Sequence, residues 1–376
     1  MTQIRGACPP RFAAVRAAFE ANFAQGGELG ARFSLAIEGE VVVDLMGGFA
    51  DRDETKPFDE RTLTSVFSTT KALAALMVAR LVDSGRLDYE QPVADVWPEF
   101  EAAGKGAITI GQALSHQGGL CGFLEPMAPT LWFDGRAICA RLEAMAPLWT
   151  PGTASGYHPV TFGYIAGEVF RRVDGRELGA ALREDLALPF GLDLWIGLPD
   201  AEHARCAHIR RPSSLPELGE MTEPKRAAFG TPWSSPGGVS LSEWRRAAIP
   251  SVTGHATAPA LALAMAVLAC EGRLDGEAVL SPRTVKAATR ARIRGSDLVL
   301  PYDVVWGAGL MRNEGLRVFG PGERAIGHYG WGGSCAFADP DMQLSGAYVM
   351  NRQSAVLVGD ARARRLIDAA YASLGG

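Results

Sequence analysis

The sequence predicts an α/β fold of the α+β kind, in which an antiparallel sheet built from the N- and C-terminal segments is flanked by helices. Three observations lead to this prediction. Two β-rich runs meet at a turn near the N-terminus, and three short β-rich runs separated by turn residues lie near the C-terminus. The chain between them carries mostly helical patterns, so we expect a mainly helical subdomain inserted between the two halves of the sheet.

The N-terminal β signal is the run ARFSLAIEGEVVVDLMGG, which begins at Ala31. Apolar and β-branched residues fill both of its halves, and Glu38-Gly39-Glu40 between them is a turn signal. A short turn between two such runs is typical of antiparallel neighbours. The pattern therefore predicts a hairpin.

Helical periodicity is the main signal in the centre of the chain. The predicted helices are, in order, Leu73–Ser84, Ile110–Leu114, Ile138–Met145, Thr161–Val173, Leu178–Asp185, Ala258–Glu271 and Pro282–Thr289. Residues 210–237 contain several Pro, Ser and Gly residues and predict a long loop. We expect residues 1–88 and 290–376 to form the α/β subdomain and residues 89–289 the mainly helical one.

The C-terminal β signal comprises the runs Ala325–Tyr329, Ser334–Ala338 and Leu344–Met350. Gly-rich or Asp-Pro breaks separate them, as in an antiparallel meander. The last amphipathic stretch, Leu357–Leu374, predicts a closing helix. Together with the N-terminal hairpin, these runs predict one sheet with strands from both ends of the chain.

Composition limits the classes of function. The chain has 376 residues, 47% of them hydrophobic and 21% charged, as in an ordinary globular enzyme with a sizeable core. A formal net charge of -5 and the lack of a basic stripe argue against nucleic acid as a partner. A small molecule is the partner that remains, and the sequence leaves the oligomeric state open.

Signals for export or membrane insertion are missing from the sequence. The most apolar run, Ala258–Cys270, has 13 residues and is too short to cross a bilayer. The first 25 residues lack the basic start, apolar run and cleavage site of a signal peptide. The 6 cysteines are widely spaced, which disfavours both a disulfide framework and a zinc site. We therefore expect a cytoplasmic protein with reduced thiols and no membrane contact.

The first candidate for chemistry is Ser68, three residues before Lys71, at the start of an apolar helix. The spacing puts both side chains on one helix face about one turn apart. An apolar setting lowers the pKa of a lysine, which makes it a proton acceptor for the serine hydroxyl. The alternative is that Ser68 or Thr69 only caps the helix and Lys71 reaches water. This pair alone leaves both interpretations open.

A second candidate, Tyr157, follows a Gly-rich approach just before a predicted helix. Such a position projects a phenol into a cleft, where a nearby lysine cation could shift it toward phenolate and let it share proton transfer. The alternative is a loop tyrosine that packs its ring. A third segment, Gly327 to Ser334, holds four glycines, which permit a backbone N–H to approach a ligand closely, or else form only a turn.

Taken in order along the chain, these three segments resemble the serine β-lactamase and penicillin-binding protein superfamily. Within it the chain is most similar to family VIII carboxylesterases, the esterase branch related to class C β-lactamases. The likeness covers most of the chain. It rests on Phe67-Ser68-Thr69-Thr70-Lys71, Leu114-Ser115-His116-Gln117-Gly118-Gly119-Leu120, Pro151-Gly152 ahead of Tyr157-His158, Gly254-His255-Ala256-Thr257 and Gly327-His328-Tyr329-Gly330.

The resemblance implies a β-lactamase-like fold forming one serine-hydrolase unit over residues 1–376, without a cofactor or metal. It implies that Ser68 is acylated, that Lys71 and Tyr157 act as a general base pair, and that the backbone N–H groups of Ser68 and Trp331 bind the oxyanion. We also expect substrate contacts from a further set of residues. They are His328, Gly330, Trp331, Trp233 and Phe123.

Two departures from the β-lactamase pattern bear on the substrate. The Tyr-x-Asn element is Tyr157-His158-Pro159 here, and the Lys-Thr-Gly element is His328-Tyr329-Gly330. An amide and a permanent cation are thereby lost, and a histidine is largely neutral at pH 7. Both changes favour short-chain neutral esters over antibiotics, so carboxylic ester hydrolysis is the predicted reaction.

Other functions use the same or different residues. An acyltransferase or a β-lactamase would use the same site, and a non-catalytic penicillin-recognising module would be acylated without turnover. An α/β-hydrolase would need a G-x-S-x-G elbow, which is absent. His203 and His208 are too poor a ligand set for a metal hydrolase. His116 is expected to stabilise its turn, and His255, which precedes the apolar helix from residue 258, to serve as a cap or structural hydrogen bond.

Overall fold

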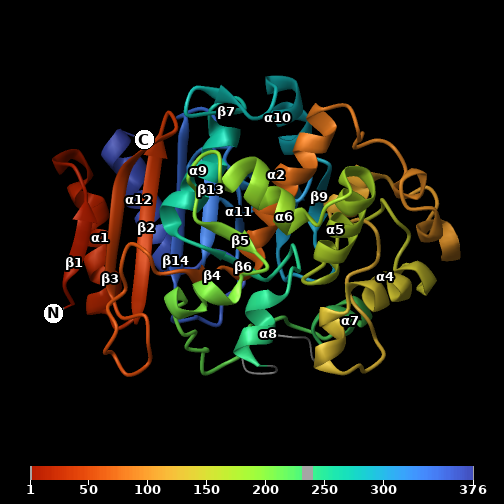
Figure 1. The fold of residues 1–376 in the computed structure, drawn as a ribbon, viewed down its shortest axis with the longest axis horizontal. Coiled ribbons are helices and arrows are strands. Elements are labelled where there is room, and N and C mark those ends of the chain that lie inside the picture. The colour runs from red at the N-terminus through yellow and green to blue at the C-terminus, as the bar shows by residue number, and fades with distance from the viewer. Residues whose placement is uncertain (1, 231–239, 376) are drawn as a thin grey trace.

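The computed structural model describes residues 2–230 and 240–375, and within them a nine-stranded antiparallel sheet forms the centre of the fold (Figure 1). The strand order is β1-β3-β2-β14-β13-β12-β11-β10-β9. The bounds are β1 Ile4–Ala7, β2 Gly30–Ile37, β3 Glu40–Gly48, β9 Ile293–Ser296, β10 Asp303–Trp306, β11 Met311–Arg312, β12 Ile326–Tyr329, β13 Cys335–Asp339 and β14 Leu344–Met350. The predicted α+β fold, with a sheet from both ends of the chain, is confirmed.

The two ends of the chain meet where β2 pairs with β14. Figure 1 shows β2 of the N-terminal hairpin beside β14 of the C-terminal meander. The register pairs Phe33 with Tyr348 and Leu35 with Gly346. The predicted hairpin and meander are both confirmed. The short strands β1, β9, β10 and β11 were not expected, because runs of two to four residues carry little periodic signal.

Side chains alternate between the two faces of the sheet, so each face packs against different helices. On one face, α9 (Ala258–Ala269) packs against small residues such as Ala336 and Ala347, and Ser345 Oγ donates to the Ala262 carbonyl at 2.7 Å. On the other face, α1 (Ala13–Ala24) and α12 (Ala361–Leu374) cover large residues such as Phe33, Phe337 and Tyr348. Small side chains let α9 approach closely, and large ones fill the wider gap.

The remaining helices lie in the inserted segment or beside it. They are α2 Thr70–Asp83, α3 Ile110–Leu114, α4 Gly135–Ala144, α5 Thr161–Asp174, α6 Leu178–Leu182, α7 Glu223–Phe229, α8 Leu241–Arg246, α10 Pro282–Thr289 and α11 Asn313–Leu316. A small sheet of order β4-β6-β5 joins β4 Thr64–Ser65, β6 Gly254–Ala256 and β5 Leu194–Ile196, and β7 Arg273–Leu274 pairs with β8 Glu277–Ala278. None of the helices described is long and apolar enough to span a membrane.

One local prediction needs correction. Residues 210–237 were expected to be a long loop, but α7 occupies Glu223–Phe229, and residues 231–237 lie outside the described part of the chain. Pro224 in the first turn, where no N–H is needed, starts α7, and Gly230 ends it. The helix α9 falls within residues 89–289 yet packs on the large sheet. The division of the chain at residues 88 and 290 stays a prediction.

Candidate active site

Ser68 lies in a tight turn that connects β4 to the buried helix α2. Phe67 has a φ of +46°, which is uncommon for a bulky residue, and Thr70 Oγ1 donates to its carbonyl at 2.5 Å. The Thr70 hydroxyl in turn accepts the Gly254 backbone N–H at 2.9 Å. Each residue of α2 from Thr70 to Ala79 is buried. The turn is thus held on both sides, and it leaves Ser68 partly exposed at the start of the helix.

Lys71 is fully buried one helical turn from Ser68. Its Nζ lies 3.2 Å from Ser68 Oγ, 2.7 Å from the Pro159 carbonyl oxygen and 3.2 Å from the Ser251 carbonyl oxygen. Burial lowers the pKa of Lys71 well below its usual value because the charged form loses hydration. The interpretation that Lys71 reaches water is therefore wrong.

Tyr157 stands over this pair. The Lys71 Nζ is 4.8 Å from the centroid of the Tyr157 ring, and the Ser68 side chain hydrogen-bonds with the phenol. Burial raises the pKa of Tyr157, and the hydrogen bond with Ser68 opposes that change only in part. The expected shift toward phenolate is wrong, because desolvation disfavours the phenolate just as it disfavours the charged form of Lys71.

Two histidines hold the segment that presents Tyr157. The His158 backbone N–H donates to His116 Nδ1 at 3.1 Å, and the Leu120 N–H donates to His158 Nε2 at 3.0 Å. The Gly156 N–H donates to the His116 carbonyl at 2.9 Å. Burial lowers the pKa of both rings, of His158 to about 3, so both are neutral and can act as acceptors. His116 thus joins its own turn to the Tyr157 segment.

The Gly-rich turn after β12 lies against the Ser68 turn. A Cβ added at Gly330 would come within 2.1 Å of the Val66 carbonyl oxygen, so only glycine permits this approach. Ser334 Oγ donates to the same carbonyl at 2.8 Å, which joins β13 to the turn before Ser68. The next residue, Trp331, packs its ring against Phe67 and makes no backbone N–H hydrogen bond within the described residues. Its N–H is free to bind an oxyanion.

His328 is buried at the end of β12 and is uncharged. Its Nδ1 donates to the Tyr329 carbonyl at 2.7 Å, and its Nε2 has no hydrogen-bond partner among the described residues. Burial, with a contribution from Lys71, lowers the pKa of His328 to about 3. At neutral pH the ring carries no positive charge.

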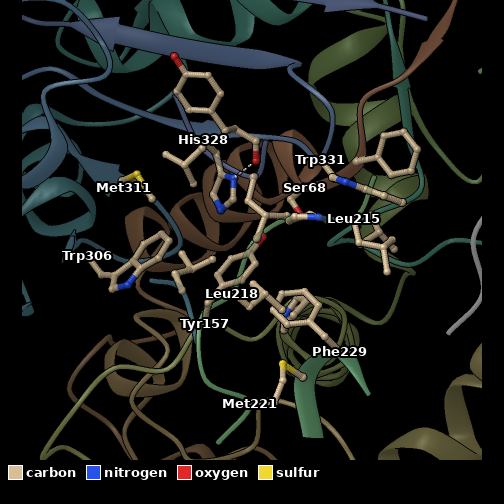
Figure 2. Close-up of a pocket in the computed structure, with 18 residues that line it drawn as sticks. Ser68, Tyr157, Leu215, Leu218, Met221, Phe229, Trp306, Met311, His328 and Trp331 are labelled. Carbon is tan, nitrogen blue, oxygen red and sulfur yellow. Dashed lines mark hydrogen bonds between the residues drawn. The ribbon is translucent and has the colours of Figure 1, made fainter. Parts of the chain in front are cut away.

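A cavity of about 320 Å³ opens in front of Ser68 and is strongly apolar. Figure 2 shows the Tyr157 phenol pointing toward Ser68, with His328 and Trp331 beside them. Trp306 and Met311 form one wall, while the far side consists of Leu215, Leu218, Met221 and Phe229. No Asp, Glu, Lys or Arg side chain is among the described residues that line it.

The structure brings together most of the residues that the sequence predicted for the site. Ser68, Tyr157, His328 and Trp331 line the cavity, Lys71 lies behind Ser68, and Gly330 packs against the Ser68 turn. Phe123 is not among the described lining residues. Its ring instead packs against the Trp132 ring, with the two ring centroids 5.7 Å apart. Trp233 lies outside the described residues.

Sequence reasoning missed much of the cavity wall. Trp306 stacks on Tyr157 with ring centroids 5.9 Å apart and planes 7° apart, and Met311 follows it in the sheet. Both belong to short strands, β10 and β11, that carried no clear signal. The wall from Leu215 to Phe229 lies in the segment read as a loop, where apolar residues among prolines were the available clue.

Comparisons with known proteins find relatives that match nearly the whole chain. Esterase/beta-lactamase LipL of Mycobacterium tuberculosis is 33% identical over 371 residues, which cover 95% of this chain and 85% of LipL. The crystal structure of a novel penicillin-binding protein homolog from Caulobacter crescentus is 64% identical and superposes with a TM-score of 0.96, covering 99% of this chain and 100% of that one. A family VIII carboxylesterase structure is 41% identical with a TM-score of 0.93, covering 99% and 100%.

The sequence also matches the Beta-lactamase family over residues 15–371, nearly the whole chain. The match includes the Ser68 turn, the Tyr157 segment and the Gly330 turn, which the fold assembles around one cavity. The chain therefore belongs to the Beta-lactamase family.

Proposed function

We propose that this serine hydrolase is a carboxylic ester hydrolase that acts on short-chain neutral acyl esters through an acyl-enzyme at Ser68. The observation that carries the proposal is a buried lysine amine of lowered pKa 3.2 Å from the Ser68 hydroxyl, at the base of a cavity without Asp, Glu, Lys or Arg among its described lining residues. An uncharged amine is a base strong enough to activate a serine, and an apolar cavity suits an acyl chain.

Lys71 supplies the base. The carbonyl oxygens of Pro159 and Ser251 accept the two N–H groups of the neutral amine. The remaining position on Nζ is the lone pair, and Ser68 Oγ is the third atom within hydrogen-bond distance. During attack on the ester carbonyl, the Ser68 proton moves to Lys71, and the oxygen forms the new bond to the acyl carbon.

Tyr157 is the second residue that transfers protons, together with Lys71. Its neutral phenol contacts Ser68, so it can protonate the leaving alkoxide and regain a proton from Lys71. In deacylation the same path runs in reverse, as Tyr157 and Lys71 together take the proton of the attacking water. The backbone N–H groups of Ser68 and Trp331 hold the negative oxygen of each tetrahedral intermediate.

The cavity supports neutral esters over β-lactams. Recognition of a β-lactam carboxylate would need a cation, but His328 is neutral and the described walls carry no charge. Similar proteins include an esterase/beta-lactamase and a family VIII carboxylesterase, so β-lactam hydrolysis remains an alternative activity for the same residues. An acyltransferase, in which an alcohol replaces water, would use this site equally well.

Turnover of p-nitrophenyl esters tests the proposal. We expect wild type to release p-nitrophenol from the butyrate ester over many turnovers, and Ser68→Ala to fold and lose nearly all activity. Lys71→Ala and Tyr157→Phe should each lower kcat/KM by about 100-fold or more, the usual contribution of a positioned base. A fluorophosphonate label should map to Ser68 by mass spectrometry. Substantial activity in Ser68→Ala would falsify the assignment.

A panel of substrates separates the ester hydrolase from its alternatives. Cephalosporin hydrolysis that is faster than ester hydrolysis would make β-lactamase the main activity. Preferential formation of a new ester in the presence of added alcohol would favour acyl transfer. A single burst of p-nitrophenol without turnover would favour a penicillin-recognising module.

A further inference from the structure

We propose that Asp297 is a positioning residue that fixes the Tyr157 phenol relative to Ser68 and Lys71. The inference rests on the proposed function, in which Tyr157 transfers protons. Asp297 follows the edge strand β9, far from Tyr157 in the sequence, and its side chain is buried beside the Tyr157 segment.

The Asp297 carboxylate accepts hydrogen bonds from three segments of the chain. Its Oδ2 accepts the Ser155 hydroxyl at 2.9 Å and the Trp306 indole N–H at 3.3 Å. Its Oδ1 accepts the backbone N–H groups of Tyr157 at 2.8 Å, Val299 at 3.0 Å and Leu300 at 2.9 Å. A carboxylate offers about four lone-pair sites, so these five donors occupy its accepting capacity. The segments are thereby joined at a single group.

The two oxygens of Asp297 hold the two partners of an aromatic stack. Oδ1 holds the main chain of Tyr157, and Oδ2 holds the indole of Trp306. The rings of these two residues lie nearly parallel, 7° apart, with centroids 5.9 Å apart. Because the backbone of the tyrosine and the ring beside it share one anchor, the direction of the phenol is fixed.

Hydrogen-bond donors alone balance the charge of Asp297. It forms no ion pair with any described residue, although only 7% of its surface is exposed. A buried carboxylate without a cation costs stability unless its donors are well aligned. A neutral side chain could not accept all five donors, which is the reason to assign the carboxylate a role in holding these segments together. The Leu298 N–H also donates to the Ser155 carbonyl at 2.8 Å, so the two loops are joined twice.

Asp339 provides a matched control. It is also buried, and it accepts the Tyr371 hydroxyl at 2.6 Å and the Asp341 N–H at 2.9 Å. It lies at the end of β13 away from the Gly330 turn. Asp339→Asn therefore measures the general effect of changing a buried carboxylate to an amide.

The first test is the steady-state kinetics of Asp297→Asn with p-nitrophenyl acetate, whose small acyl group depends little on the cavity wall. An amide places N–H groups where the carboxylate accepts N–H or O–H donors, so the Tyr157 segment has to move. We expect kcat to fall by about tenfold or more, as misplacement of a catalytic group does. We expect KM to stay within about threefold. Asp339→Asn should lower Tm by a comparable amount and leave kcat unchanged.

The second test is a double-mutant cycle with Tyr157→Phe. If Asp297 acts through the phenol, Asp297→Asn should lower kcat/KM by less than about threefold once the phenol is gone. The same loss in both backgrounds would overturn the proposal, as would an unchanged kcat in Asp297→Asn. Where turnover is too slow, the rate of fluorophosphonate labelling at Ser68 supplies the measurement.

Folding failure and failure of the proposed function give different results. If Asp297→Asn does not fold, Ser155→Ala can replace it, because this change removes a single hydrogen-bond donor from the same carboxylate. Ser155→Ala is then combined with Tyr157→Phe in the same double-mutant cycle. We expect it to lower kcat by about threefold when the phenol is present and not when it is absent. Wild type without ester turnover, or an active Ser68→Ala, would count against the proposed function. If activity depends on Ser68 but the losses of Asp297→Asn and Tyr157→Phe multiply in the double mutant, only the role of Asp297 would be contradicted.

Discussion

The charge state of Lys71 follows from where α2 places it. Ten consecutive buried residues of that helix leave the amine no path to water, and two backbone carbonyls provide its fixed partners. Carbonyl dipoles accept N–H groups but do not replace a counter-ion, so the charged form remains disfavoured. The lysine is therefore ready as a base without a neighbouring anion.

Activity should depend on pH through this amine. A base must be unprotonated to accept the Ser68 proton, so kcat/KM is expected to be constant above the lowered pKa of Lys71 and to fall as pH drops through it. Lys71→Arg should lose nearly all activity at every pH, because a guanidinium stays charged. The measurement is kcat/KM for p-nitrophenyl butyrate against pH. Recovery of Lys71→Arg activity at alkaline pH, or no acidic limb in wild type, would contradict this role.

Which residues of the site could be read from the sequence depends on how their contacts arise. Ser68 and Lys71 interact within one helical turn, so their spacing predicted that the two side chains lie together, and the apolar helix predicted the direction of the lysine pKa. Tyr157 was found through its order among other motifs. Asp297 and Ser251 reach the site only through tertiary packing, and no local pattern marks them.

At the scale of elements, a buried ionic cluster supports the turn that carries Trp331. The Arg362 guanidinium, at the start of α12, donates to the Gly332 carbonyl at 2.7 Å and pairs with Glu28 at 3.1 Å and Asp360 at 3.0 Å. The Tyr348 hydroxyl donates to Glu28 as well. The cluster joins the N-terminal segment, β14 and α12 behind the Gly-rich turn. The geometry of the proposed oxyanion site thus depends on both ends of the chain.

Glu28 should make stability depend on pH. Burial raises its pKa from 4.5 to about 7, although Arg362 and Tyr348 oppose the change. Between these two pH values the folded protein holds a proton that the unfolded chain has lost. The stability that Glu28 contributes is therefore complete below pH 4.5 and is lost as pH rises to about 7. In wild type, this group should lower the free energy of unfolding by about 3 kcal/mol as pH rises from 4.5 to about 7. Glu28→Gln should not show this decrease.

Denaturant unfolding of wild type and Glu28→Gln at a series of pH values tests this effect. Buried histidines such as His158 and His328 act in the opposite direction, because their pKa is lowered to about 3, so the difference between the two proteins is the quantity that isolates Glu28. Glu54→Gln changes an exposed carboxylate and serves as control. Parallel curves for wild type and Glu28→Gln would contradict the prediction.

The elements themselves were predictable where their pattern was long. The central helices and the paired hairpin and meander have enough residues to show a period of 3.6 or 2. The short strands β9, β10 and β11 have two to four residues each, and their pairing with one another and, through β11, with β12 defines them more than their composition does. For α7, proline at the start and neighbouring turn residues obscured seven helical positions.

At the scale of the whole molecule, the site belongs to neither predicted subdomain alone. Ser68 and the Gly330 turn come from the terminal segments, and Tyr157 comes from the insertion. A single hydrophobic cluster runs through both, from Met46 in β3 through Phe162 in α5 to Val349 in β14. Sequence patterns predicted the sheet and the helical insertion, but they do not show that both parts share one hydrophobic core.

This shared core predicts one cooperative unfolding transition. Because α2 and α9 are buried between the insertion and the sheet, loss of either part would expose the apolar surface of the other, at a cost of about 25 cal/mol per Å². Differential scanning calorimetry should give equal calorimetric and van't Hoff enthalpies for a reversible transition. Ester hydrolysis and tryptophan fluorescence should be lost together. Two separate transitions, with residues 89–289 unfolding first in hydrogen exchange, would contradict this view and would make the predicted boundaries those of independent folding units.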